Sequence, residues 1–319
     1  GIYACLRHFQ TKREKGMKQH TLKRAYKFSG KGLHSGIHNT ITLIPAAPNH
    51  GIRFLRTDLG EDAFVSASIT NVYPSSRNTS LREGDAVVMT CEHLLSAMCG
   101  LGVDNLLVKM DAPEVPILDG SARPYIEAIL ADGLHEQDAE RRYISVTEPL
   151  IYKDDKSDGE IAFYPSDKLE IYLTTDFGSK VLGVQRTHYS DNTDYAAEIA
   201  PCRTFCFFHE LEYLVSQGLV QGGDMDNAIV IVEHPASDEA VSRMSRHFGV
   251  EGLTITSEGY LNNLKLNFPD ECGRHKMLDL IGDLYLAGAP IKGHIEAYKT
   301  GHRLNAEALK SLLNKIYYG

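Results

Sequence analysis

The segment of residues 272–287 constrains the fold most strongly, because its two faces differ in chemistry. One face carries an apolar stripe at the i, i+3, i+4, i+7 spacing, formed by Met277, Leu280, Ile281 and Leu284. This spacing predicts a helix packed on a hydrophobic core. His275 and Asp279 lie one turn apart on the opposite side, so that imidazole and carboxylate can reach one ion. The same spacing is also typical of a solvated or salt-bridged helix face, so a metal site requires a third ligand from elsewhere.

Glu92 and His93 are the best source of that ligand. They lie in a segment, residues 88–98, whose apolar residues Leu94, Ala97 and Met98 follow helical spacing. A catalytic zinc typically takes three protein ligands and leaves a fourth position for water. Adjacent helical residues diverge by about 100°, so one can bind the ion while the other addresses the water. We therefore predict His93 as the third ligand and Glu92 as the general base.

The order of elements around these two helices predicts an internal duplication. In each half a polar-faced helix passes through a glycine, Gly100 or Gly288, into a strand at residues 104–109 or 293–298. A chain of 319 residues is roughly twice the usual domain length of about 150 residues. We expect a first domain at residues 17–140 and a second at residues 141–319, divided at the charged segment 136–142. Residues 1–16 are expected to be an N-terminal extension, and they lack the features of a secretory signal.

Both halves mix strands and helices. Alternating or β-branched runs predict strands at residues 39–44, 52–56, 160–164 and 168–174. Apolar periodicity predicts further helices at residues 121–133, 210–217, 238–248 and 305–317. The glycine-rich segment 30–36 resembles a phosphate loop but lacks its GK[ST] ending, so a hairpin turn is expected.

Composition excludes several classes of protein. A net charge of −9 argues against a nucleic-acid partner, which would require a basic surface. No apolar run approaches the roughly 20 residues of a transmembrane helix. The six cysteines are dispersed, without a CxxC pair, which favours a reducing cytoplasm over a disulfide scaffold.

His302 and Asp283 are weaker candidates. His302 follows the strand after the metal helix, where a loop side chain can reach the site and protonate a leaving amine, although an ordinary turn histidine fits as well. Asp283 lies one turn beyond Asp279 and can orient such a histidine, although a surface aspartate is common at such positions.

Several segments resemble one known family. Residues 90–97 (TCEHLLSA), 275–279 (HKMLD) and 299–302 (KTGH) are similar to those of UDP-3-O-acyl-N-acetylglucosamine deacetylases. Residues 29–36, 111–121 and 203–205 agree in order, and the resemblance covers essentially everything after Met17.

The resemblance implies a zinc enzyme of lipid A biosynthesis, which removes acetate from the glucosamine nitrogen of an acylated UDP-sugar. By position, His93, His275 and Asp279 match the zinc ligands and Glu92 the general base. His302 matches the cationic acid, Asp283 its partner and Thr204 the oxyanion-binding residue. The positions that match substrate contacts are Phe177, Phe205, Lys276 and Lys299.

The family fold implied is α+β, with two similar domains that each pack a β-sheet on a pair of helices. Each domain carries one insert, expected near residues 64–82 and 201–232, and the second insert builds a tunnel for the acyl chain. The active site is expected between the domains. In some bacteria the enzyme is fused to an acyl-carrier-protein dehydratase, so such a fused domain is a possible partner.

Two rival functions and the metal's identity stay open at this level. A zinc peptidase would use similar metal chemistry in an open groove, and a sugar-nucleotide-binding protein would hold a structural metal with four protein ligands. Ligands of the His and Asp type also accept iron or cobalt.

Overall fold

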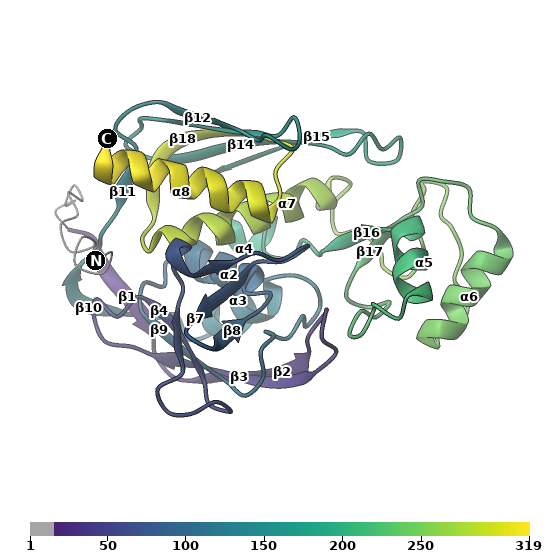
Figure 1. Ribbon diagram of the computed structural model, residues 1–319, viewed down its shortest axis with the longest axis horizontal. Helices are drawn as coiled ribbons and strands as arrows, with labels where there is room; N and C mark the ends of the chain where they lie inside the picture. Colours follow the sequence, from purple (N-terminus) through teal and green to yellow (C-terminus); the bar gives the residue numbers. More distant parts are fainter. Residues whose placement is uncertain (1–15) are drawn as a thin grey trace.

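The computed structural model describes residues 16–319, and it confirms the predicted α+β class. Of the expected N-terminal extension, residues 1–15 lie outside the described part of the chain. Sheets and helices alternate in layers, with helices lying between two sheets (Figure 1).

The first half is built on a five-stranded sheet in the order β2-β3-β9-β4-β5. Strand β9 runs parallel to β4, and the other pairs are antiparallel. The strands are β2 (Tyr26–Lys31), β3 (His38–Pro45), β4 (Ile52–Arg56), β5 (Phe64–Ser66) and β9 (Leu106–Met110), and the helices are α2 (Glu92–Leu101) and α3 (Arg123–Leu130). The β2–β3 connection forms the hairpin expected at residues 30–36.

The second half repeats this arrangement with the strand order β12-β13-β18-β14-β15. Here β18 runs parallel to β14, and β11 is added beside β18. The strands are β11 (Ile144–Ser145), β12 (Leu150–Lys153), β13 (Glu160–Tyr164), β14 (Leu169–Asp176), β15 (Val184–Ser190) and β18 (Ile291–Tyr298). The helices are α4 (Tyr195–Glu198), α7 (Glu271–Leu284), the 3₁₀ turn η2 (Tyr285–Ala287) and α8 (His302–Tyr318).

The two halves therefore share one strand order and one set of strand directions, with α2 and α7 preceding equivalent parallel strands. Helices α2 and α7 pack against each other, and one hydrophobic cluster contains buried residues of both, among them Leu94, Met98, Leu278 and Ile281. Because this core is shared, the division into domains at residues 17–140 and 141–319 stays a prediction.

The charged segment 136–142, which we took as the boundary between the domains, lies largely in a strand. Most of it belongs to β10 (Leu134–Glu140), which pairs antiparallel with β1 (Lys18–Leu22). The charged side chains face solvent from this two-stranded ribbon, while Gln137 is buried and donates to the carbonyl of Ala46.

Two small units accompany the two main sheets, and only the second extends from the layered body. A three-stranded sheet of β6 (Val72–Tyr73), β7 (Ser80–Glu83) and β8 (Ala86–Val88), with the 3₁₀ turn η1 (Ile69–Asn71), occupies the region of the first expected insert. The second unit consists of β16 (Phe205–Phe207), α5 (Phe208–Ser216), β17 (Ile229–Ile231) and α6 (Asp238–Phe248).

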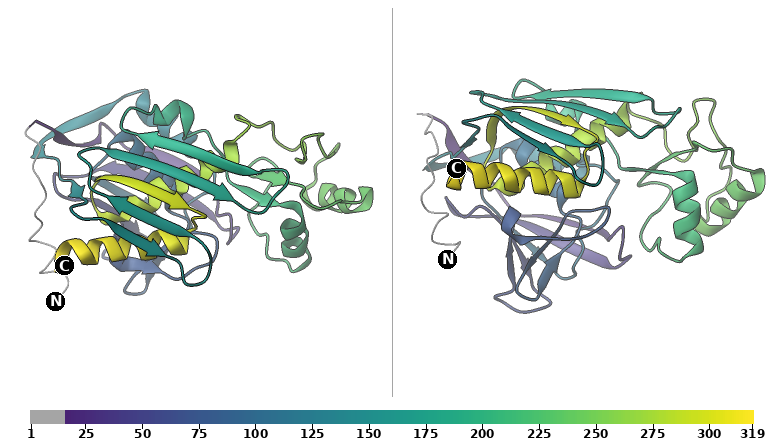
Figure 2. Two further views of the ribbon diagram at one scale, coloured as in Figure 1. Left: turned by 90° about the horizontal axis from the view of Figure 1, so that it is seen from above. Right: turned by 45° about the horizontal axis from the view of Figure 1, so that its top comes forward.

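This second unit projects to one side of the body in every view (Figures 1 and 2). It has its own hydrophobic cluster, in which Phe208 and Leu211 of α5 share a core with Val241 and Met244 of α6. The projection therefore continues through α6, beyond the limit at residue 232 that we expected. Among residues 16–319, none of the helices combines the length and the apolar character needed to span a membrane.

Candidate metal centre

Helices α2 and α7 bring the candidate metal ligands together. His93 lies in the first turn of α2, and His275 and Asp279 lie one turn apart on α7. A close crossing permits this, because a Cβ added to Gly282 of α7 would come within 2.2 Å of the Glu92 carbonyl oxygen. Only glycine fits so close a backbone approach.

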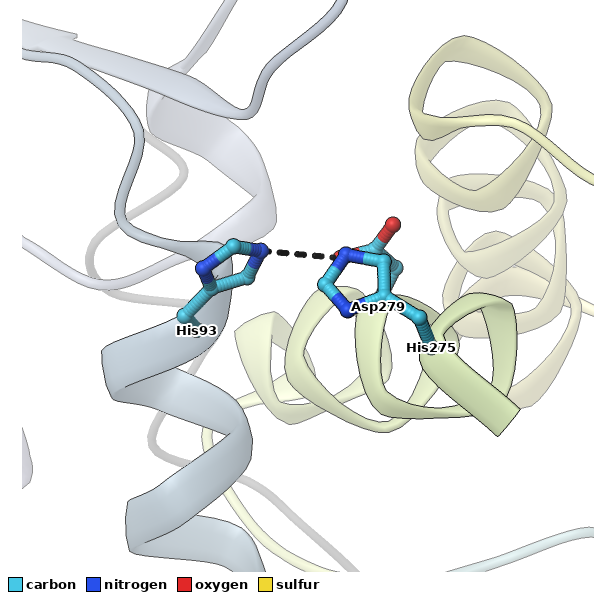
Figure 3. A group of neighbouring side chains, drawn as sticks. All are labelled: His93, His275 and Asp279. Atoms are coloured by element: carbon cyan, nitrogen blue, oxygen red, sulfur yellow. Dashed lines mark ion pairs between the residues drawn. The ribbon is translucent and has the colours of Figure 1, made fainter. Parts of the chain in front are cut away.

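Figure 3 shows the three side chains converging between the helices. The Asp279 Oδ1 atom lies 3.4 Å from His93 Nε2 and 3.4 Å from His275 Nε2. One ligand atom from each residue can be chosen so that all three lie within 4.8 Å of one another. All three residues are buried.

The donor set fits a divalent cation on two grounds. Asp279 Oδ1 is buried and has no hydrogen-bond partner, although such atoms normally have one. His275 Nδ1 lies 2.9 Å from the Cys202 carbonyl oxygen, which leaves the lone pair on Nε2, the nitrogen that faces Asp279. An unpaired carboxylate oxygen and a ring nitrogen aimed at the same point are the groups that a metal ion would join.

The charge states of these residues agree with that fit. Burial lowers the pKa of His275 to about 4, so the ring is neutral. The pKa of Asp279 lies well below its usual range, because the neighbouring histidines outweigh the effect of burial. Asp279 in turn raises the pKa of His93 against the effect of burial, so a cation would displace a proton there.

Glu92 and His302 lie beside the three ligands. His302 Nε2 is 3.6 Å from Glu92 Oε1 and 3.9 Å from Asp279 Oδ2. Burial raises the pKa of Glu92. Burial alone would lower the pKa of His302, but the carboxylates of Asp283 and Glu92 raise it to about 10. The carboxyl group of Glu92 and a cationic imidazole therefore face each other next to the candidate metal position.

His302 is not the loop residue that we expected. It begins α8, with the extended Gly301 as the preceding cap residue. Its Nδ1 lies 2.8 Å from Asp283 Oδ2, so Asp283 is its partner rather than a surface carboxylate. Asn305 of α8 also donates to Asp283 at 2.9 Å. The helix fixes the ring more firmly than a flexible turn would.

Thr204 reaches the site from the segment before β16. Its amide donates to the Gly120 carbonyl oxygen at 2.8 Å, and its own carbonyl accepts from Ile229 at 2.9 Å. The preceding residue, Arg203, forms a salt bridge with the buried Glu271 in the first turn of α7 at 2.9 Å. These contacts tie Thr204 to the helix that carries His275.

A cavity of about 970 Å³ joins the predicted site residues. Ten of the eleven line it: Glu92, His93, Phe177, Thr204, Phe205, His275, Lys276, Asp279, Lys299 and His302. Asp283 is the exception, because it lies behind His302. At one end the cavity continues between apolar residues of the projecting unit, among them Phe207, Leu211, Leu214, Val220 and Met225.

The predicted substrate contacts in the cavity wall are two phenylalanines and two lysines. Phe177 packs edge-on against Phe205, with ring centroids 5.5 Å apart. Lys299 pairs with Asp158 at 2.8 Å. Sequence patterns did not predict Arg203, Glu271 and Asn305, because their roles depend on contacts between segments far apart in the chain.

Comparison with known proteins identifies the family. A sequence model of the family described as UDP-3-O-acyl N-acetylglycosamine deacetylase matches residues 19–248 and 250–314. The chain belongs to this family. The resemblance found in the sequence motifs is thereby confirmed.

Relatives from several bacteria support the family assignment. The UDP-3-O-acyl-N-acetylglucosamine deacetylase of Haemophilus influenzae (strain PittEE) is 40% identical over 93% of this chain and 90% of its own length. The enzyme of the same name from Teredinibacter turnerae is 38% identical, covering 94% of this chain and 91% of the relative. The bifunctional enzyme LpxC/FabZ of Bacteroides thetaiotaomicron is also 38% identical, but this chain spans only 65% of its length.

Proposed function

We propose that this chain is a metal-dependent deacetylase acting on a UDP-3-O-(3-hydroxyacyl)-N-acetylglucosamine. It hydrolyses the acetamide to a free amine and acetate, as the committed step of lipid A biosynthesis. The observation that carries the proposal is a His–His–Asp ligand set flanked by Glu92 and a cationic His302. The family membership and the names of the relatives support the choice of substrate.

In the proposed mechanism, His93, His275 and Asp279 would hold a divalent cation, which would polarise the acetamide carbonyl and acidify a water molecule. Glu92 accepts a proton from this water as its oxygen attacks the carbonyl carbon. The Thr204 hydroxyl donates a hydrogen bond to the developing oxyanion. His302 donates its Nε2 proton to the glucosamine nitrogen as the C–N bond breaks.

The positions of these groups support separate proton roles. Glu92 and His302 approach each other through Oε1 and Nε2, the atoms that are free of their other hydrogen bonds. Asp283 accepts a hydrogen bond from Nδ1, the other ring nitrogen of His302, and stabilises the positive charge of the ring. A base that is ionised and an acid that is protonated at neutral pH are the states the reaction requires.

The shape of the cavity supports an acylated sugar nucleotide over a peptide. We propose that the apolar residues of the projecting unit receive the acyl chain. Phe177, Phe205, Lys276 and Lys299 contact the sugar or nucleotide, and the lysines supply positive charge for the diphosphate. A peptidase would instead need an open groove with exposed strand edges.

Zinc is the metal that we propose, because two histidines and an aspartate are typical ligands of catalytic zinc sites. Iron or cobalt would also bind such a set. A cytoplasmic location and a partner dehydratase domain are proposed on the basis of dispersed cysteines and of the bifunctional LpxC/FabZ relatives.

Acetate release tests the proposed activity. We expect the purified chain to release one acetate for each new amine from the acylated UDP-N-acetylglucosamine, and far less from UDP-N-acetylglucosamine without the acyl chain. Glu92→Gln protein, purified in parallel, controls for contaminating hydrolases. Equal release by wild-type and Glu92→Gln protein, or none from the acylated substrate, would contradict the proposal.

A further inference from the structure

Thr79 links the two halves of the molecule at the proposed site, and neither the sequence motifs nor the proposed mechanism assigns it a role. It is buried, and it directly precedes β7 in the first half. Its hydroxyl contacts Asp283 Oδ1 at 2.5 Å and His302 Nδ1 at 3.1 Å, both in the second half. Its backbone amide donates to Glu92 Oε2 at 3.1 Å.

The proton on the hydroxyl fixes the direction of these hydrogen bonds. A carboxylate only accepts, so Thr79 donates its single hydroxyl proton to Asp283. The hydroxyl oxygen then has only lone pairs left for His302, and Nδ1 must be the donor. His302 Nδ1–H is therefore shared between Thr79 Oγ1 and Asp283 Oδ2, which lies at 2.8 Å. Nε2 is left as the ring nitrogen that faces Glu92.

The backbone around Thr79 is fixed to the start of α2. The amide of Cys91 donates to the Thr79 carbonyl oxygen at 3.3 Å, one residue before Glu92. The neighbouring Asn78 donates from its side chain to Thr90 Oγ1 at 3.1 Å. The position of Thr79 is thus set by the same segment that sets the position of Glu92.

We propose that Thr79 is a positioning residue that holds Glu92 and His302 in register, so that Oε1 and Nε2 face one substrate amide. The backbone amide restrains the base, and the hydroxyl restrains the imidazole ring together with Asp283. A threonine suits this role because its branched Cβ restricts the rotation that would move the hydroxyl. The role in turnover rests on the proposed deacetylase function.

The first test compares hydroxyl-bearing and hydroxyl-free variants. Thr79→Val keeps the shape and the backbone amide but removes the hydroxyl, so we expect kcat to fall roughly 10- to 100-fold, with KM within about threefold. Thr79→Ser should recover most of the lost kcat. The matched control is Thr187→Val, because the Thr187 hydroxyl is buried without a hydrogen-bond partner, and kcat should not change. Bound metal should be equal in all four proteins.

Wild-type kcat in the Thr79→Val protein, or a loss in Thr79→Ser as large as that in Thr79→Val, would overturn the proposal. If Thr79→Val does not fold cooperatively, Thr79→Ala serves as the hydroxyl-free variant with the same expectations.

A second test does not depend on activity. In protein labelled with ¹⁵N at histidine, the His302 imidazole signals are assigned by their loss in His302→Gln. We expect the His302 Nδ1 proton to exchange with water at least about threefold faster in Thr79→Val than in wild type, and near the wild-type rate in Thr79→Ser. Equal exchange in wild type and Thr79→Val would overturn the proposal. A wild-type chain without deacetylase activity would refute the proposed function, while this measurement would still decide whether Thr79 positions the ring.

Discussion

At the scale of single residues, the candidate site holds two groups that we propose transfer protons, Glu92 and His302, only 3.6 Å apart. Burial would by itself neutralise both Glu92 and His302. The positive charge of His302 favours the ionised form of Glu92, and three carboxylates favour the protonated form of His302. Each group therefore stabilises the state that its partner needs in the proposed mechanism.

Replacing Glu92 by glutamine tests its role as base apart from metal binding. We expect Glu92→Gln to lower kcat by roughly 10² to 10⁴, because only proton transfer is removed. The metal bound per chain, measured by elemental analysis, should stay at the wild-type level. Glu239→Gln on the exposed face of α6 is the control and should leave both quantities unchanged. Loss of the metal from Glu92→Gln would show that Glu92 is a ligand and not the base.

Local spacing was enough to predict side chains that lie together on one face of a helix. His275 and Asp279 are such a pair, and the structure places His93 beside them. Thr79, Asn305 and the carbonyl of Cys202 could not be predicted in this way, because their partners lie far away in the sequence. Hydrogen bonds formed only by tertiary contact leave no periodic signal in the chain.

At the scale of elements, a salt bridge joins the start of α8 to Asp154, the residue that follows β12. Arg303, the second residue of α8, donates to Asp154 Oδ2 at 2.6 Å, and Ser157 donates to the same oxygen at 2.6 Å. The hydrogen bond from Arg303 is the main reason that the pKa of Asp154 lies well below its usual range. This pair helps to hold the helix that carries His302.

The depressed pKa makes the contribution of Asp154 dependent on pH. A lowered folded-state pKa stabilises the fold above the unfolded-state value of about 3.9, and this stabilisation is lost as pH falls through the folded-state value. We expect Asp154→Asn to lower the free energy of unfolding by about 1 kcal/mol at pH 7, since Arg303 is partly solvent-screened.

Urea unfolding at several pH values measures this difference. The difference in the free energy of unfolding between wild type and Asp154→Asn should be constant from pH 7 to about pH 5, and it should become smaller below about pH 4. The exposed neighbour offers a matched control: Asp155→Asn should have the wild-type free energy of unfolding at each pH. If the difference in the free energy of unfolding between wild type and Asp154→Asn became larger at low pH, the assigned salt bridge would be contradicted.

Sequence patterns located elements with strong periodicity well. The expected strand at residues 52–56 and helix at residues 238–248 match β4 and α6 at both ends. Helix α2 begins later than expected, because residues 86–88 are taken up by β8. Strand β10 was not predicted, because Gln137 is its only buried residue and the segment has no alternating apolar pattern.

At the scale of the whole molecule, two topologically equivalent halves place their helices face to face, and the projecting unit extends the resulting cavity. The duplication was visible in the order of elements, since equivalent strands follow α2 and α7. The shared core was not visible in the sequence, because apolar periodicity shows that a helix face is buried but does not show which element it packs against. The motifs at residues 90–97 and 275–279 pointed to the candidate site without this information.

A charge in the apolar end of the cavity tests the proposed acyl-chain site. Leu214 of α5 lines the cavity, whereas its neighbour Tyr213 is exposed on the other side of the helix. We expect Leu214→Glu to lower kcat/KM for the acylated substrate by about tenfold or more, because an acyl chain would desolvate the carboxylate. Tyr213→Glu is the control, and it should change kcat/KM for the acylated substrate little. Equal effects of the two variants would place the acyl chain elsewhere.

Metal titration tests the central claim most directly. Apoprotein prepared with a chelator is titrated with Zn²⁺ while bound metal and acetate release from the acylated substrate are followed together. We predict that activity is absent at the start, rises in proportion to bound metal and reaches its plateau at one equivalent per chain. His275→Ala should neither retain that metal nor regain activity. Full activity in metal-free protein, or wild-type metal binding and activity in His275→Ala, would contradict the account.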